Sequence, residues 1–421
     1  MNTETQRELA RIVEGLMATA TRTNAAQPRR YFYPLSMATY GVDEVIEAIG
    51  SMVNFRTSMW EKTLQFERQF ATYLDCNDAV MVNSGSSADL LLAFLLRNPA
   101  KPLLEVGDEI LVPAVTWPTH VWSPLMAGFK VRLVDVDPGT FNLDLDDVER
   151  KIGPKTRALF LVHLMGNPCD MDRVLALCER HNLLLLEDCC ESLGAAWKGR
   201  KVGNFGIGGS FSFFFSHHIS TMEGGMLSCP NAEVAAQLRV LRAHGWVRNV
   251  GMPQQPAPCA DIDPRYTFVN WGFNVRPTEL QAGFGIHQML KLPAFNQRRN
   301  ELAERFFAFI DASGYLTRPK AHPSAQPAWF CLPLLLQPDA PFSRDAITGY
   351  LETNGVETRP VVTGNIARQP VARLFDGLAE DALPGADVIH ERGFYIGLSP
   401  YVSDEMLDRL IDCFRKFFRT F

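Results

Sequence analysis

Between residues 79 and 229 the chain alternates short apolar runs with amphipathic stretches, and this pattern restricts its fold more than any other feature. The apolar runs are strand-like in length and cover residues 79–83, 109–113, 130–136, 157–163, 183–188, 210–215 and 224–229. Strands that are apolar on both faces and separated by helices form a largely parallel sheet covered on both sides. The pattern therefore predicts a large α/β domain, with ligands bound at the carboxyl ends of its strands.

The sequence changes character after residue 250. A Gly/Pro-rich stretch at 250–264 is followed by a long helical pattern at 276–314, and the remainder reads as a small α+β domain that ends in an amphipathic helix. We expect three parts: an N-terminal segment (1–34), a large domain (35–290), and a helical connection with a small C-terminal domain (291–421).

Charge and cysteine content narrow the functional class. A net charge of −6 argues against a broad nucleic-acid-binding surface or a polybasic membrane contact. Nine cysteines exclude complete disulfide pairing within one chain, and most of them lie in apolar runs, as in a reduced cytoplasmic protein. The N-terminus lacks the apolar stretch of a secretory signal, and no run of about 18 apolar residues predicts a membrane span.

Polar residues cluster where the predicted strands end. Ser84, Gly85 and Ser86 follow one strand and open a helix, where free N–H groups and a close backbone approach suit a phosphate. The same residues also fit an ordinary helix N-cap. Ser212, in a later strand, supplies a second hydroxyl for the same anion.

Asp188 ends the most apolar strand, where a carboxylate is costly unless it meets a cation. A protonated pyridine nitrogen is such a cation, although Asp188 also fits a helix cap. Trp117 is placed to stack on a planar cofactor, and a tryptophan that only packs in the core fits the sequence equally well.

The segment 210–226 resembles the lysine loop of the sugar aminotransferase family of pyridoxal-phosphate (PLP) enzymes. Phe211-Ser212-Phe213 and Glu223-Gly224-Gly225 are in register with that loop, but His217 occupies the lysine position. The similarity extends over roughly residues 35–420, through the motifs at 83–90, 112–123, 162–172, 187–195, 244–249 and 272–285.

The resemblance implies the PLP-dependent transferase fold type I: a large α/β domain, a small C-terminal α+β domain, and a homodimer with an active site shared between subunits. It implies these cofactor-binding residues: Gly85, Ser86, Trp117, Asp188, Glu191, Ser212, Arg248 and Asn274. In this assignment Asn274 reaches the phosphate from the partner subunit and Arg248 lies near cofactor or substrate. Glu191 stands where the aminotransferases usually carry glutamine.

Histidine in place of lysine resembles one branch of that family, the nucleotide-sugar 3-dehydratases of deoxysugar pathways such as the colitose pathway. Imidazole cannot link covalently to PLP, so PLP or pyridoxamine phosphate (PMP) is held non-covalently, and His217 exchanges protons. The resemblance implies removal of the C3 hydroxyl from a nucleotide-linked 4-keto-6-deoxyhexose, with PMP regenerated from L-glutamate. The segment 355–370 also resembles this branch and is expected near the sugar.

Three alternatives remain at this stage. A second 3-dehydratase branch uses PMP with a [2Fe–2S] cluster and a reductase partner, but the cysteines after His217 (Cys229, Cys259, Cys331 and Cys413) stand singly, so we expect no metal. A non-catalytic sugar-binding protein and an aminotransferase with an unrecognised lysine are the others. The nucleotide (GDP, CDP or dTDP) is not identified by the sequence.

Overall fold

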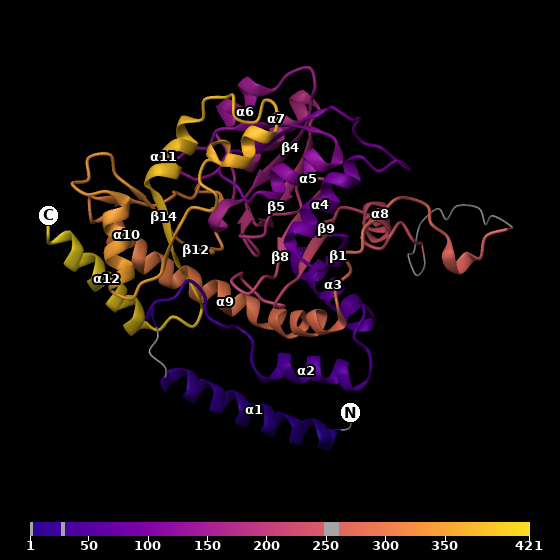
Figure 1. Ribbon diagram of the computed structural model, residues 1–421, viewed down its shortest axis with the longest axis horizontal. Helices are drawn as coiled ribbons and strands as arrows, with labels where there is room; N and C mark the ends of the chain where they lie inside the picture. The colour runs from indigo at the N-terminus through magenta and orange to yellow at the C-terminus, as the bar shows by residue number, and fades with distance from the viewer. Residues whose placement is uncertain (1–2, 27–29, 248–260) are drawn as a thin grey trace.

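The computed structural model describes residues 3–26, 30–247 and 261–421 (Figure 1). Arg248, Cys259 and most of the Gly/Pro-rich stretch fall outside the described residues. The helices are α1 (Thr3–Ala26), α2 (Val42–Val53), α3 (Glu61–Leu74), α4 (Gly85–Leu96), α5 (Thr119–Ala127), α6 (Leu145–Lys151), α7 (Met171–His181), α8 (Ala232–Arg242), α9 (Glu279–Asp311), α10 (Arg344–Thr353), α11 (Pro384–Arg392) and α12 (Asp404–Phe418).

The strands fall into three sheets. They are β1 (Asp78–Val82), β2 (Glu109–Pro113), β3 (Lys130–Val134), β4 (Thr156–Val162), β5 (Leu184–Asp188), β6 (Ala196–Trp197), β7 (Arg200–Lys201), β8 (Gly208–Ser212), β9 (Gly225–Cys229), β10 (Leu316–Thr317), β11 (Ala325–Gln326), β12 (Cys331–Leu336), β13 (Thr358–Pro360) and β14 (Gly393–Gly397). No helix among the described residues is both long and apolar enough to cross a membrane.

The largest sheet has the order β1-β9-β8-β5-β4-β2-β3. Its centre is parallel, from β3 through β2, β4 and β5 to β8, and the antiparallel strands β9 and β1 complete one edge. Helices α4, α5 and α8 pack on one face, while α6 and α7, together with α3 and α9, pack on the other. The predicted large α/β domain with a mostly parallel sheet is confirmed.

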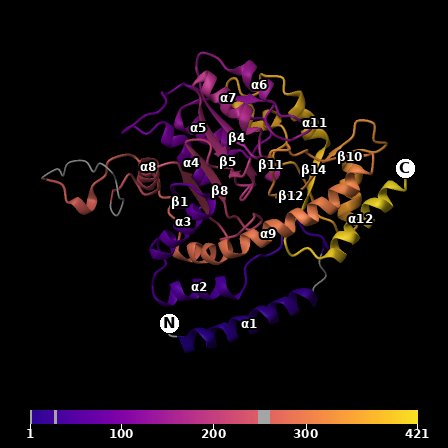
Figure 2. The same cartoon turned by 180° about the vertical axis from the view of Figure 1, so that it is seen from behind.

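A second, antiparallel sheet lies in the C-terminal part, with the order β10-β12-β14-β13. It shares a separate hydrophobic core with the end of α9 and with α10 and α12. Helix α9 runs without a break from the large sheet to this core (Figure 2). One continuous helix therefore spans residue 290, where we placed the domain boundary, and the exact division of the chain stays a prediction.

A buried carboxylate fixes the strand that leads to the first of the predicted site motifs. Glu67 on α3 accepts a hydrogen bond from the backbone N–H of Met81 in β1 at 2.9 Å and pairs with Arg242 of α8 at 2.7 Å. Arg242 also donates to the Met81 carbonyl at 2.6 Å. Both charged side chains are buried, and Arg242 depends on Glu67 for its counter-charge, while Glu67 has Arg239 as a second partner at 3.4 Å.

Glu67→Gln preserves the side-chain shape but leaves the Arg242 guanidinium buried without a counter-ion. We expect the free energy of unfolding to fall by about 3 kcal/mol, measured by urea denaturation. Glu233→Gln, which breaks the exposed pair with Lys101, is the control and should change it by less than about 1 kcal/mol. Equal effects of the two substitutions would contradict the structural role of Glu67.

Candidate active site

A cavity of about 520 Å³ opens at the carboxyl ends of the parallel strands, between the large sheet and the second sheet. Seven of the predicted site residues line it: Gly85, Ser86, Trp117, Asp188, Glu191, Ser212 and His217. Asn274 is exposed and does not line it. Arg248 falls in the part of the chain that is not described. The strand topology therefore gathers residues that are up to 132 positions apart in the sequence.

The segment between β1 and α4 forms a narrow recess at one end of this cavity. The Ser84 side chain caps α4 by accepting the Ser87 N–H at 3.1 Å, so the N-cap interpretation holds. The N-terminal end of α4 still favours an anion through its free N–H groups. A Cβ on Gly85 would lie 2.6 Å from the Ser212 Cβ, so only glycine leaves the recess open.

Asp188 presents a negative charge to the cavity from the end of β5. Its Oδ1 accepts hydrogen bonds from the Cys190 N–H at 3.0 Å and the Ser210 hydroxyl at 3.1 Å, and its Oδ2 lies 3.2 Å from His120 Nε2. Burial raises the pKa of Asp188, but His120 and the Cys190 N–H outweigh burial and hold that pKa below its ordinary value. No helix follows β5 in the described residues 189–207, so Asp188 is not a helix cap.

His217 lies in the loop between β8 and β9. Its ring is 5.1 Å from the Phe330 ring, and its backbone carbonyl accepts a hydrogen bond from Arg299 at 3.2 Å. The Nδ1 atom is buried without a hydrogen-bond partner. Burial, together with the Arg299 charge, lowers the pKa of His217 to about 4, so the imidazole is neutral at neutral pH and Nδ1 is free to accept a proton.

Two further predicted residues complete the lining. Glu191 accepts a hydrogen bond from the Met165 N–H at 2.9 Å, and burial raises the pKa of its carboxyl group to about 7. Trp117 is 56% exposed, so its ring does not pack in the core and is open to a ligand. The site thus combines an anion recess, a flat aromatic surface, a fixed carboxylate and a neutral base.

Sequence reasoning missed several residues that line the same cavity, and four of them carry side chains able to take part in binding or proton transfer: Asp89, His120, Arg359 and Tyr395. Asp89 and His120 fall inside the motifs at 83–90 and 112–123, and Arg359 falls inside the segment 355–370 that we expected near a sugar. Those motifs were the available signal for three of them. Tyr395 belongs to β14 and had no motif to indicate it.

Comparisons with known proteins identify relatives of this chain. Residues 42–415 match the model of the DegT/DnrJ/EryC1/StrS aminotransferase family. A GDP-4-keto-6-deoxy-D-mannose 3-dehydratase of Yersinia pseudotuberculosis is 36% identical over 389 residues, which cover 91% of this chain and 98% of the relative.

Two solved structures of the enzyme with this activity have the same fold. The Escherichia coli enzyme with bound hydrated PLP has a TM-score of 0.87 and 33% identity, covering 91% of this chain and 99% of the other. A structure with a trapped PLP-glutamate geminal diamine has a TM-score of 0.86 and 33% identity, covering 90% and 99%. These similarities confirm the predicted fold class and the predicted family resemblance.

The environment of His217 predicts an unusual titration. In the ligand-free protein we expect the His217 ring to remain neutral down to a pH near 4, because burial and Arg299 disfavour the charged form. Histidine ring signals followed by NMR from pH 8 to 4 test this, with the His217 signal assigned by its loss in His217→Asn. A transition near pH 6.5, as for an exposed histidine, would contradict it.

Proposed function

This chain belongs to the DegT/DnrJ/EryC1/StrS aminotransferase family, and from that premise we propose that it removes the C3 hydroxyl of a nucleotide-linked 4-keto-6-deoxyhexose, with PLP and PMP as its non-covalently bound cofactor. The observation that carries the proposal is His217 at the position of the family's lysine, facing a cavity whose other residues suit PLP. The activity of the Yersinia relative supports the same reaction, and supports GDP as the nucleotide.

The cavity residues fit PLP in size and charge. The recess at Gly85, with Ser86 and Ser212 beside it, suits the phosphate, because the added Cβ of any other residue would fill it. The exposed Trp117 ring offers a face for the pyridine ring, and the Asp188 carboxylate offers a partner for a protonated ring nitrogen. The buried His217 Nδ1 has no hydrogen-bond partner within the protein, so it is available to a bound ligand.

Two side chains of the protein have separate roles: Asp188 keeps a negative charge and His217 transfers a proton. When bound, the cofactor supplies the amine that joins the sugar ketone and a ring that takes up electrons. Asp188 holds negative charge at the ring nitrogen throughout. His217 accepts a proton at Nδ1 and, once charged, donates it to the leaving C3 hydroxyl, and the Phe214 and Phe330 rings beside it limit access of water.

The balanced reaction is sugar ketone plus L-glutamate giving 3-deoxy sugar ketone, 2-oxoglutarate and ammonia. The two electrons that replace the C3 hydroxyl with hydrogen come from the oxidation of glutamate, and the water released by elimination is used in hydrolysis of the nitrogen-bearing product. The solved neighbour with a PLP-glutamate adduct supports glutamate as the amino donor.

We also propose a cytoplasmic homodimer with shared active sites. Asn274 is exposed and lies outside the cavity of its own chain, as expected of a residue that completes the site of a partner subunit. Its side chain is oriented by Arg276, whose Nε donates to Asn274 Oδ1 at 2.9 Å. Arg248 stays a proposed contact for the cofactor or substrate.

An iron–sulfur route finds no support in the cysteine positions. Cys229, Cys331 and Cys413 lie on β9, β12 and α12. Among the described residues, the groups of three or more metal-ligating side chains within reach of one ion contain no more than one cysteine. Four thiolate ligands are the usual requirement of such a cluster.

Incubation with PLP, L-glutamate and GDP-4-keto-6-deoxymannose should yield equal amounts of 3-deoxy sugar, 2-oxoglutarate and ammonia, measured by mass spectrometry and enzymatic assay. His217→Asn should lower the rate about 10²- to 10⁴-fold, because it removes the acid/base group. The same assay with the CDP- and dTDP-linked sugars shows which nucleotide the enzyme prefers. An amino sugar product, or a requirement for iron and a reductase, would contradict the proposal.

His217→Lys restores the residue that links covalently to PLP in the aminotransferases. We expect borohydride to trap PLP on this variant, with the added mass on the peptide that contains residue 217. The wild type and His217→Asn should release PLP on denaturation after the same treatment. Borohydride-trapped PLP in the wild-type protein would contradict non-covalent binding.

A further inference from the structure

A second histidine lies directly behind Asp188, outside the roles assigned above. His120 on α5 has its Nε2 atom 3.2 Å from Asp188 Oδ2 and 3.5 Å from Oδ2 of Asp89 on α4. All three residues are at most 3% exposed. These residues, hereafter the Asp89–His120–Asp188 cluster, place one imidazole between two carboxylates in the wall of the cavity.

The groups around both ring nitrogens indicate the charge of the His120 ring. Its Nδ1 lies 2.6 Å from the Thr116 hydroxyl, which can donate or accept, and 3.0 Å from the Trp117 carbonyl oxygen, which only accepts, so a hydrogen on Nδ1 suits both contacts. Its Nε2 faces two carboxylates, so a lone pair there would be repelled and Nε2 also carries a hydrogen. A ring with hydrogens on both nitrogens is an imidazolium.

The titration behaviour of the cluster agrees with this geometry. Burial lowers the pKa of His120, but Asp89 and then Asp188 outweigh burial and raise that pKa to about 9. Burial raises the pKa of Asp89 to about 6, which leaves it ionised at slightly alkaline pH. Two carboxylates and one imidazolium then carry a net charge of −1.

A net charge of −1 matches the single positive charge of a protonated pyridine nitrogen. An imidazolium paired with Asp188 alone would neutralise that carboxylate and weaken its hold on the ring proton. The second carboxylate, Asp89, compensates the His120 charge and leaves Asp188 effectively anionic. The Thr119 hydroxyl fixes Asp89 by donating to its Oδ2 at 2.7 Å.

The cluster also connects the three segments that hold the parts of the cofactor. Asp89 lies on the first turns of α4, whose N-terminus forms the phosphate recess. His120 is bonded to the carbonyl of Trp117, the residue with the exposed ring, and it contacts Asp188 at the end of β5. The His120 and Phe160 rings pack edge-to-face, with their centroids 5.0 Å apart, and this contact with β4 restricts the plane of the imidazolium.

We propose that Asp89 and His120 are positioning residues that, through Asp188, keep the pyridine nitrogen of the bound cofactor protonated and align the three cofactor-holding segments. The inference rests on the proposed function in requiring PLP at this site. Neither residue needs to touch the cofactor, since both act through Asp188 and Trp117.

Other titratable groups surround the cluster and affect its pH dependence. Glu191 and Cys190 follow Asp188 in the chain, and His217 faces it across the cavity. Burial holds the pKa of the Cys190 thiol well above its ordinary value, so that side chain is neutral. Of these groups, Glu191, with a pKa of about 7, is the one that changes charge near neutral pH.

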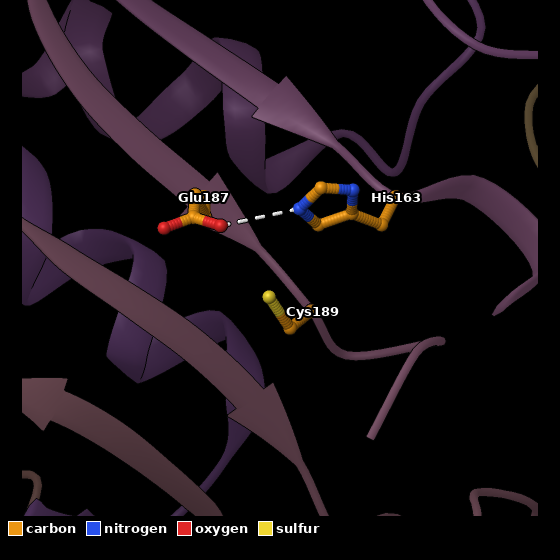
Figure 3. Close-up of side chains that lie close together, drawn as sticks. All are labelled: His163, Glu187 and Cys189. Carbon is orange, nitrogen blue, oxygen red and sulfur yellow. Dashed lines mark hydrogen bonds and ion pairs between the residues drawn. The ribbon is translucent and has the colours of Figure 1, made fainter. Parts of the chain in front are cut away.

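A buried pair on the opposite face of β5 provides a matched control. His163 Nε2 lies 3.2 Å from Glu187 Oε2, with Cys189 beside them (Figure 3). His163 Nδ1 accepts the Cys169 N–H at 3.0 Å, so this ring has one hydrogen, on Nε2, and is neutral. Glu187 is held by the Gly203 and Gly206 N–H groups and does not contact Asp188 through its side chain.

The first test uses the cofactor-free protein labelled with ¹⁵N-histidine and followed by NMR from pH 5 to 10. We expect His120 to carry hydrogens on both nitrogens at pH 7.5 and to titrate near pH 9. Asp89→Asn should lower this transition by about 1 pH unit or more, and His163→Asn should leave it in place. A neutral His120 ring at pH 7.5, or an Asp89→Asn transition identical to the wild type, would overturn the proposal.

The second test adds PLP labelled with ¹⁵N in its ring. The wild type should show a protonated ring nitrogen at pH 8, whereas Asp89→Asn, which leaves the His120 charge uncompensated, should show a ring pKa about 1 unit lower and about tenfold weaker PLP binding. His120→Asn, which removes the link between Asp188 and the Trp117 segment, should weaken PLP binding about tenfold. His163→Asn should match the wild type. Circular dichroism confirms that each variant is folded, and the near-isosteric Asp89→Asn remains informative if His120→Asn does not fold.

The two tests separate this inference from the proposed function. Titration of His120 as expected, without PLP binding to the wild type, would refute the proposed cofactor and with it the positioning role. PLP binding with a ring nitrogen that is insensitive to Asp89→Asn would refute the positioning role alone. Stoichiometric metal in the purified protein, lost in Asp89→Asn, would show that the cluster is a metal site and overturn the inference.

Discussion

The negative charge of Asp188 at the end of β5 is the constraint on which the rest of the site depends. A carboxylate in this position is surrounded by apolar strands, and desolvation alone would raise its pKa. The Cys190 N–H, the Ser210 hydroxyl and the His120 ring together keep it ionised. The segments that supply these groups are therefore fixed around one oxygen pair, and the cavity takes its shape from them.

The sheet topology explains why a single charge organises segments from so many parts of the chain. The parallel strands β4, β5 and β8 end at the same edge, and the antiparallel strand β9 returns the chain beside β8. The turn between β8 and β9 therefore holds His217 above that edge. Arg299 of α9 fixes this turn by donating to the His217 carbonyl and to the carbonyls of Phe330 and Leu398. The position of the base consequently depends on both sheets.

The sequence was sufficient for features whose signal is local. Apolar runs located the strands of the large sheet, and the residues at their ends located five that line the cavity: Gly85, Ser86, Trp117, Asp188 and Ser212. Glu191 and His217 came from the family resemblance. The antiparallel edge of β1 and β9 was not predictable, because apolar runs carry no information on strand direction. The run at 210–215 also exceeded its strand: β8 ends at Ser212, and Phe214 and Phe215 are exposed in the following turn.

Asp89 and His120 show why part of the site escaped the sequence. Each falls inside a recognised motif but on its helical part, where a polar residue ordinarily indicates a solvated face. Asp89 and His120 form a cluster with Asp188 only in the folded protein, because α4 and α5 then pack on the same face of the sheet and bring two carboxylates and one imidazole together. The proposed role of Asn274 depends on the assembly of two subunits, because the site it would complete belongs to the partner subunit.

The two histidines of the cavity wall differ in charge because their surroundings differ in the number of carboxylates they face. His120 lies between two carboxylates and is an imidazolium, whereas His217 is half-buried against Phe330 and near Arg299 and is neutral. Elimination needs a group that accepts and then returns a proton, and a permanently protonated residue cannot begin that cycle. The neutral ring of His217 is therefore suited to accept and return a proton. The charged ring of His120 is suited to stabilise the anion at Asp188. Exchanging their environments would leave the site with neither a base nor a stable anion at Asp188.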